Sequence, residues 1–206
     1  MTWGIVMITE KDIVFIKLGV DEFEECIMNA KSICFHIRDR ADLHERDLLE
    51  RFNNILMGEV AEKMVIKWLN NNGKFAVSSV DKSSKKPDHG HDILLKKKGG
   101  NVYCSVKSSL SALKNIDYII DNFKLATKKN ELTEVNIQVY FWLTINPKET
   151  GATRVTVPSL NQAAIIGWFG QNDIKNFTTY NREHRESPNV ALKQSRPMVT
   201  LLEYII

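Results

Sequence analysis

The most regular hydrophobic pattern in the chain runs from Arg46 to Asn70. Apolar residues recur there at steps of three and four, which places them on one face of a helix: Leu48, Leu49, Phe52, Ile55, Leu56, Val60, Met64 and Trp68. The run Asn70–Gly73 ends this helix, because asparagine and glycine tolerate the left-handed conformation of a helix stop. A less regular pattern over residues 21–44 predicts an earlier helix.

The segment after this helix carries the signals of three strands, a helix and a fourth strand. Gly99-Gly100-Asn101 separates the second and third strands, and these residue types supply the positive φ of a tight hairpin turn. The last strand is almost continuously apolar, which indicates burial on both faces. The predicted strands cover residues 75–80, 91–97, 102–107 and 135–145, and the helix covers roughly residues 110–128.

The two ends of the chain give weaker patterns. The apolar opening is interrupted by Glu10, Lys11 and Asp12, so it predicts a strand or short loop rather than a signal peptide or a membrane span. Residues 151–206 predict a short strand around Val155, a helix near residues 160–166, a turn at residues 167–170, and a polar, basic tail that ends in LLEYII.

Composition narrows the class of protein. With 206 residues, 43% of them hydrophobic, the chain can form one α/β domain with a proper core. No stretch approaches the roughly 20 consecutive apolar residues of a membrane helix, so we expect no membrane association. The three cysteines are odd in number and widely spaced, which favours a reducing cytoplasm. The net charge of +3 permits a nucleic-acid partner without requiring one.

The predicted hairpin brings an acid and a lysine to one edge of the sheet. Alternation along the strand places Tyr103, Ser105 and Lys107 on one face, while Asp92 begins the partner strand. A carboxylate can hold a hard cation that polarises a phosphate, and an adjacent lysine can stabilise the developing charge. Asp92 is therefore the candidate central metal ligand, and the Val106 carbonyl is a candidate backbone ligand.

Glu59 is a second candidate. On a helical wheel it falls at the margin of the apolar stripe, where an inward carboxylate is costly unless a positive group meets it. A metal shared with Asp92 would meet that need, and Glu62 could assist. The alternative interpretation is that Glu59 turns outward or pairs with Lys63.

These motifs, in this order, resemble the PD-(D/E)xK nuclease superfamily, which includes type II restriction endonucleases and Holliday-junction resolvases. The resemblance rests on Glu59 in the helix, Pro87-Asp88, Gly90-His91-Asp92-Ile93, and Ser105-Val106-Lys107, and it covers about residues 46–145. It implies a single nuclease domain over residues 1–206, with an α-β-β-β-α-β core whose central mixed sheet is flanked by helices. It also implies that Asp92 binds Mg²⁺, with Mn²⁺ as a substitute, that Lys107 is the catalytic lysine, and that Glu59 is the supporting helix acid.

The chain departs from the family pattern at one position and leaves two alternatives open. Ser105 stands where the family has its (D/E)xK acid, so Glu59 either replaces that carboxylate or the site is weakened. Asp88 competes with Asp92 as the primary acid, although Asp92 directly precedes the apolar strand. His89, His91 and Cys104 could instead be read as zinc ligands, but Cys104 points away from the Lys107 face. His91, like Ser105, is otherwise a supporting residue of the site.

Basic residues suggest where DNA would lie. Lys85 and Lys86 are candidates to bind phosphates, whereas the arginines of the tail, Arg182, Arg185 and Arg196, are of the type that reads bases. The alternative interpretation is that the lysines form a solvated face and the tail an ordinary polar loop. The favoured hypothesis is a type II restriction endonuclease that cuts double-stranded DNA as a homodimer. The alternatives are a structure-specific repair or recombination nuclease and a catalytically inactive DNA-binding module.

Overall fold

The structure is a computed structural model that describes residues 7–35, 47–82, 91–112, 115–127, 131–143, 163–176, 178–182 and 185–206. Its centre is a six-stranded sheet in the order β1-β6-β5-β4-β3-β2, and β7 and β8 form a separate two-stranded sheet. Only β4 and β5 run parallel among the neighbouring pairs of the large sheet, so the sheet is mixed. These strands are β1 (Val14–Phe15), β2 (Ala76–Ser78), β3 (Ile93–Lys97), β4 (Gly100–Ala112), β5 (Val135–Leu143), β6 (Ala163–Gly170), β7 (Thr178–Arg182) and β8 (Arg185–Asn189).

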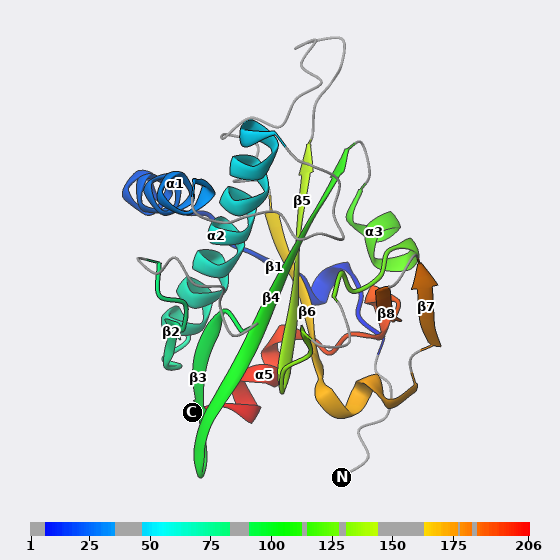
Figure 1. Ribbon diagram of the computed structural model, residues 1–206. Helices are drawn as coiled ribbons and strands as arrows, with labels where there is room; N and C mark the ends of the chain where they lie inside the picture. Colours follow the sequence, from blue (N-terminus) through cyan, green and yellow to red (C-terminus); the bar gives the residue numbers. More distant parts are fainter. Residues whose placement is uncertain are drawn as a thin grey trace.

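Helices cover both faces of the large sheet. One face packs against α1 (Val20–Cys34), α2 (Leu48–Asn71) and α5 (Met198–Tyr204) in a single apolar core. The other face packs against α3 (Ile116–Asn122), the short helix η5 (Leu192–Gln194), and the residues Ile8 and Ile13 that flank the short helix η1 (Glu10–Asp12), in a second core. Figure 1 shows α2 lying along the β2–β4 part of the sheet and α3 on the opposite side of the molecule. A third short helix, η4 (Gln171–Asn176), follows β6.

The helix predicted over Arg46–Asn70 is confirmed. Asp47 caps α2, and its carboxylate accepts a hydrogen bond from the Glu50 amide at 2.8 Å. The helix stops after Asn71, and Gly73 adopts a positive φ of 72°. Leu56, Val60 and Met64 are fully buried, as their spacing predicts. Within residues 21–44, the described helix is α1, which ends at Cys34.

The hairpin is also confirmed, but its second strand is longer than predicted. Gly99 and Gly100 have positive φ angles of 97° and 157° and join β3 to β4. Parallel pairing with β5 carries β4 on through Ala112, so residues 110–112 are strand and the prediction of a helix from residue 110 is wrong there. The helix begins only at Ile116, where Asn115 accepts a hydrogen bond from the Tyr118 amide.

The prediction of a helix near residues 160–166, followed by a turn at residues 167–170, is wrong over the part that the structure describes, residues 163–170. Residues 163–170 form β6, which pairs antiparallel with both β1 and β5 and is buried along almost its whole length. The basic tail forms the β7–β8 hairpin over part of its length, and the apolar end forms α5. The strand predicted around Val155 lies outside the described residues.

The α/β class and the order α2-β2-β3-β4-α3-β5 agree with the sequence-based expectation. The parallel β4–β5 pair stands beside the antiparallel β3–β4 hairpin, which places the end of β2, the start of β3 and the middle of β4 together. The helices described here include none that is both long and apolar enough to cross a bilayer.

Candidate active site

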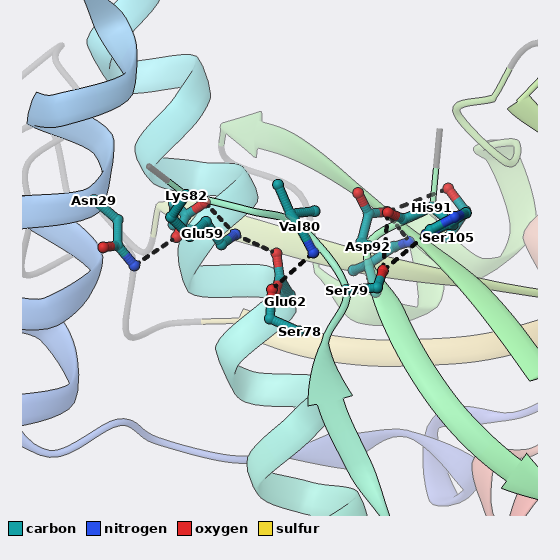
Figure 2. A network of polar contacts seen from close by, with 11 residues as sticks. Asn29, Glu59, Glu62, Ser78, Ser79, Val80, Lys82, His91, Asp92 and Ser105 are labelled. Atoms are coloured by element: carbon teal, nitrogen blue, oxygen red, sulfur yellow. Dashed lines mark hydrogen bonds and ion pairs between the residues drawn. The ribbon is translucent and has the colours of Figure 1, made fainter. Parts of the chain in front are cut away.

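Asp92 lies immediately before β3, between the end of β2 and the middle of β4. Its amide donates to the Cys104 carbonyl, and its carbonyl accepts from the Ser79 amide, both at 2.9 Å. Its carboxylate turns toward β4, where Oδ2 accepts from the Val106 amide at 2.6 Å and from the Ser105 hydroxyl at 3.3 Å. Figure 2 shows Ser79, His91, Asp92 and Ser105 gathered around this point. The backbone thus fixes the carboxylate against the neighbouring strand.

The Val106 carbonyl is directed toward the same side of β4 as Asp92. In an extended strand the N–H and C=O of one residue point to the same neighbour. Because the Val106 N–H donates to Asp92, its carbonyl also faces the region beyond the start of β3. The Val106 side chain packs against the core that α2 covers. Asp92 and Val106 therefore offer two oxygen donors on adjacent strands.

The structure supplies a physical reason for a serine at position 105. Ser105 is fully buried, its amide donates to Thr133 Oγ1 at 3.0 Å, and its hydroxyl bonds Asp92. A carboxylate at this position would be desolvated and would lie against a second acid, and both effects oppose ionisation. Ser105 instead satisfies Asp92 with a neutral donor.

Lys107 lies on the same face of β4 as Ser105 and has an acidic partner. Its Nζ is 3.0 Å from Glu131 Oε2, and the two side chains are only 20% and 16% exposed. Glu131 was not identified from the sequence. The segment before β5 folds back along β4, so that Thr133 contacts Ser105 and Glu131 contacts Lys107. The polar run before the most apolar strand was the only signal of this, and it does not specify the pairing.

The helix acids form a second cluster with a lysine that sequence reasoning also missed. Lys82 Nζ lies 2.6 Å from Glu59 Oε1 and 2.8 Å from Glu62 Oε2. Asn29 of α1 donates to Glu59 at 3.1 Å, and Ser78 hydrogen-bonds Glu62. Figure 2 shows these side chains close together and at a distance from Asp92, His91 and Ser105. The alternative partner for Glu59, Lys63, pairs with Glu25 instead.

Burial controls the protonation of this second cluster. Glu62 is a buried residue, and burial raises the pKa of its carboxyl even though Lys82 acts to lower it. Burial also acts to lower the pKa of Lys82, but the two carboxylates outweigh that effect and raise it. Glu59 and Glu62 therefore share one counter-ion in a poorly solvated place.

The raised pKa of Glu62 predicts a pH-dependent difference in stability between wild type and Glu62→Gln. A carboxyl whose folded pKa lies above its unfolded value binds its proton more tightly in the folded state. The wild type should therefore lose stability relative to Glu62→Gln as pH rises from the ordinary pKa of glutamate through the raised value. Urea unfolding of both proteins at several pH values measures this difference. A wild type that keeps or gains stability relative to Glu62→Gln as pH rises contradicts the assignment.

The two clusters lie on opposite faces of the hairpin. Cys104 and Val106 point into the core that α2 covers, so Ser105 and Lys107 point the other way. Glu59 and Glu62 come from α2, whereas Asp92 bonds Ser105. Among the described residues, no group of three or more His, Cys, Asp or Glu is placed to hold a metal ion. The structure thus brings together Asp92, Ser105 and the Val106 amide, while Glu59 and Glu62 contact Lys82.

The other predicted residues fall into three groups. Asp88, His89, Lys85 and Lys86 lie outside the described residues. Arg182 and Arg185 are paired in register by their backbones at the end of the β7–β8 hairpin. Arg196 is engaged internally, since Nη2 lies 2.5 Å from Asp173 Oδ1 and its guanidinium lies 4.8 Å from the centroid of the Trp168 ring. Its charge is therefore already paired.

The structure argues against Cys104 as the sulfur ligand of a zinc site. Cys104 is fully buried in the α2-side core, and burial raises the pKa of its thiol well above the usual range. Cys104 points away from the face on which His91 stacks against Tyr103, so these two side chains do not converge on one metal ion. His91 contacts Ser79 Oγ through Nδ1 at 2.8 Å and stacks on Tyr103.

The donors near Asp92 suit magnesium better than zinc. Magnesium is commonly held by one or two carboxylates, with substrate phosphates and water completing the octahedron. Asp92 and the Val106 carbonyl are hard oxygen donors of that kind. Among the described residues, this place offers one carboxylate and one backbone carbonyl as oxygen donors.

Comparisons of the chain with family models, curated proteins and solved structures find no match.

Proposed function

We propose that this chain is a magnesium-dependent endonuclease that hydrolyses phosphodiester bonds in DNA. One observation carries the proposal: the Asp92 carboxylate is fixed against the Val106 amide, on the face of β4 that also carries Lys107. The element order α2-β2-β3-β4-α3-β5 supports it, because the resemblance to PD-(D/E)xK nucleases implies that order and places the acid and the lysine on this hairpin.

The proposed roles follow from the chemistry of each group. Asp92 and the Val106 carbonyl would hold the cation, with Asp88 as a further candidate. When bound, a divalent cation polarises a phosphoryl oxygen and lowers the pKa of water. Lys107 would stabilise the negative charge that develops on the phosphate, and Glu131 would hold the Lys107 ammonium in place. Glu59 and Glu62 would contribute through Lys82, by fixing the segment that follows β2.

The favoured substrate is double-stranded DNA cut at a specific site by a homodimer of restriction type. A second candidate is a structure-specific nuclease, and a specific observation favours it: an exposed aromatic ring, Tyr103, lies two residues from Ser105 on the same face. Such a ring can stack on a base that is not already stacked in a duplex.

Incubation of the purified chain with unmethylated plasmid and with a branched DNA, in Mg²⁺ or in EDTA, tests the proposal. Cleavage that requires Mg²⁺ is the expected result. Discrete plasmid fragments support the restriction type, and cleavage of branched DNA alone supports the structure-specific type. Binding without cleavage in either Mg²⁺ or Mn²⁺ contradicts the proposal and selects the inactive DNA-binding module.

We expect Lys107→Met to reduce the cleavage rate by on the order of 10²-fold to 10³-fold, because a preorganised charge at the developing anion is lost. Glu131→Gln should reduce it by up to about 100-fold, because Lys107 is misplaced rather than removed. Since Glu131 acts through Lys107, a Lys107→Met/Glu131→Gln double variant should be no slower than Lys107→Met alone. Single-turnover cleavage rates measure all three.

Lys97→Met provides the matched control for this series. Lys97 also pairs with a glutamate, Glu134, but at the far end of the hairpin. Its removal should leave the cleavage rate within about two-fold, as for an exposed ion pair. Equal losses for Lys97→Met and Lys107→Met would contradict the role assigned to Lys107.

A further inference from the structure

Three successive rows of side chains cross the open face of the β2–β3–β4 layer. The middle row is Val77, Leu94 and Tyr103, which are paired in register across the three strands. The row toward the hairpin turn contains Lys96 and its partner Asn101, with Phe75 beside Lys96. The row in the opposite direction contains Ser79, Asp92 and Ser105. Neighbouring rows are about 6.6 Å apart, since they are two residues apart along a strand and each residue advances about 3.3 Å.

The middle row is apolar and exposed. Val77 is 40% and Tyr103 47% exposed, although α2 covers the other face of the same strands. An exposed aromatic ring at the centre of a sheet is costly in water and provides a surface for a planar ligand.

The Tyr103 ring is held in a fixed orientation. His91 stacks on it with ring centroids 4.1 Å apart and an interplanar angle of 25°. His91 is itself fixed through the hydrogen bond between its Nδ1 and Ser79 Oγ, at 2.8 Å. His91 thus covers one face of the tyrosine ring, and the residue keeps 47% of its surface exposed. Figure 2 shows His91 directly beside Asp92 and Ser105. Because His91 stacks on Tyr103, the tyrosine ring lies next to the candidate active site.

Positive charge lies on the other side of the exposed ring. Lys96 is exposed, and its Nζ is 4.3 Å from the centroid of the Phe75 ring. Lys98, in the adjoining turn, is also exposed. A planar ligand on Tyr103 would therefore have lysines at one end and Asp92 with Lys107 at the other. This arrangement suits a polyanion whose planar groups and charges alternate.

We infer that this face binds an unpaired segment of a DNA strand, with one base stacked on Tyr103. A phosphate on one side of that base would meet Lys96. The strand would continue across the ring toward the row of Asp92 and Ser105, which lies two rows, or about 13 Å, from the row of Lys96. The inference rests on the proposed nuclease function and deepens it, because a stacked base must first be free of its duplex neighbours.

Binding of a fluorescein-labelled single strand of about 15 nucleotides, measured by anisotropy in EDTA, tests this surface without requiring cleavage. Tyr103→Ala should weaken binding by about 5-fold to 150-fold, the range that one lost base–aromatic stack produces. Tyr103→Phe should bind like the wild type, because stacking does not need the hydroxyl. Tyr118→Ala removes an equally exposed tyrosine from α3 and should have no effect. The matched duplex should be insensitive to Tyr103→Ala.

The outcomes separate this inference from the function on which it rests. Tyr103→Ala binding within two-fold of wild type overturns the surface, even if Mg²⁺-dependent cleavage is found. Equal weakening for single strand and duplex overturns the assignment to unpaired DNA, and tighter Tyr103-dependent binding of RNA overturns the assignment to DNA. Tyr103-dependent binding of single strands without cleavage in Mg²⁺ or Mn²⁺ supports the surface and overturns the nuclease.

Discussion

Asp92→Asn should lower the rate of Mg²⁺-dependent DNA cleavage by on the order of 10³-fold while leaving the fold intact. The loss is large because this carboxylate lies against Val106 on the face of β4 that carries Lys107, where the cation is proposed to bind. Metal-assisted stabilisation of a phosphoryl transition state is worth several kcal/mol, and each 1.36 kcal/mol changes the rate tenfold. Single-turnover kinetics on the substrate found by the cleavage assay measure the effect.

The asparagine is chosen because it preserves the local structure. Its carbonyl oxygen can still accept from the Val106 amide and the Ser105 hydroxyl, so the hairpin loses charge but not its hydrogen bonds. Asp121→Asn, on the exposed side of α3, is the matched control and should cleave at the wild-type rate. A fully active Asp92→Asn enzyme with normal thermal unfolding would remove Asp92 from the mechanism.

Lys82→Met should destabilise the protein by about 3–5 kcal/mol, because it leaves the Glu59 and Glu62 carboxylates without their shared counter-ion. The Lys82 side chain is only 21% exposed and the glutamates about half as much, so water replaces the lost charge poorly. For a domain of this size the loss corresponds to a fall in Tm of roughly 6–20 °C. Urea and thermal unfolding measure both quantities.

Two further variants show whether the buried charge is the cause. Lys63→Met breaks the pair with Glu25, whose side chain is 57% exposed, and should cost no more than about 1 kcal/mol. Adding Glu59→Gln and Glu62→Gln to Lys82→Met should recover much of the lost stability, because the uncompensated charges are removed. A Lys82→Met loss no larger than that of Lys63→Met would show that the cluster is not a buried ion pair in solution.

Long periodic patterns and turn chemistry predicted the part of the fold that carries the candidate site. The apolar spacing over α2 and the glycines at Gly99 and Gly100 reflect local rules, so a single sequence expresses them directly. The β6 segment was misjudged because a short apolar run satisfies a buried helix and a buried strand equally well. Only its pairing with β1 and β5, which tertiary structure creates, decides between them.

In the candidate site, too, features set by local rules were predicted and features set by tertiary contacts were not. Strand alternation correctly placed Ser105 and Lys107 on one face and Cys104 on the other, because alternation is a property of the strand itself. The partners Lys82 and Glu131 were missed, since each lies more than 19 residues from the acid or lysine that it contacts. Such pairings depend on how distant segments fold over the sheet, and no local pattern encodes them.

The central claim is that Asp92 and the Val106 carbonyl hold a divalent cation beside Lys107. Anomalous scattering from a crystal of the protein with bound DNA, soaked in Mn²⁺, tests it most directly. The account predicts a manganese peak within coordination distance of the Asp92 carboxylate and the Val106 carbonyl. A peak elsewhere, or no peak at Asp92 when DNA occupies the face of the hairpin, would contradict it.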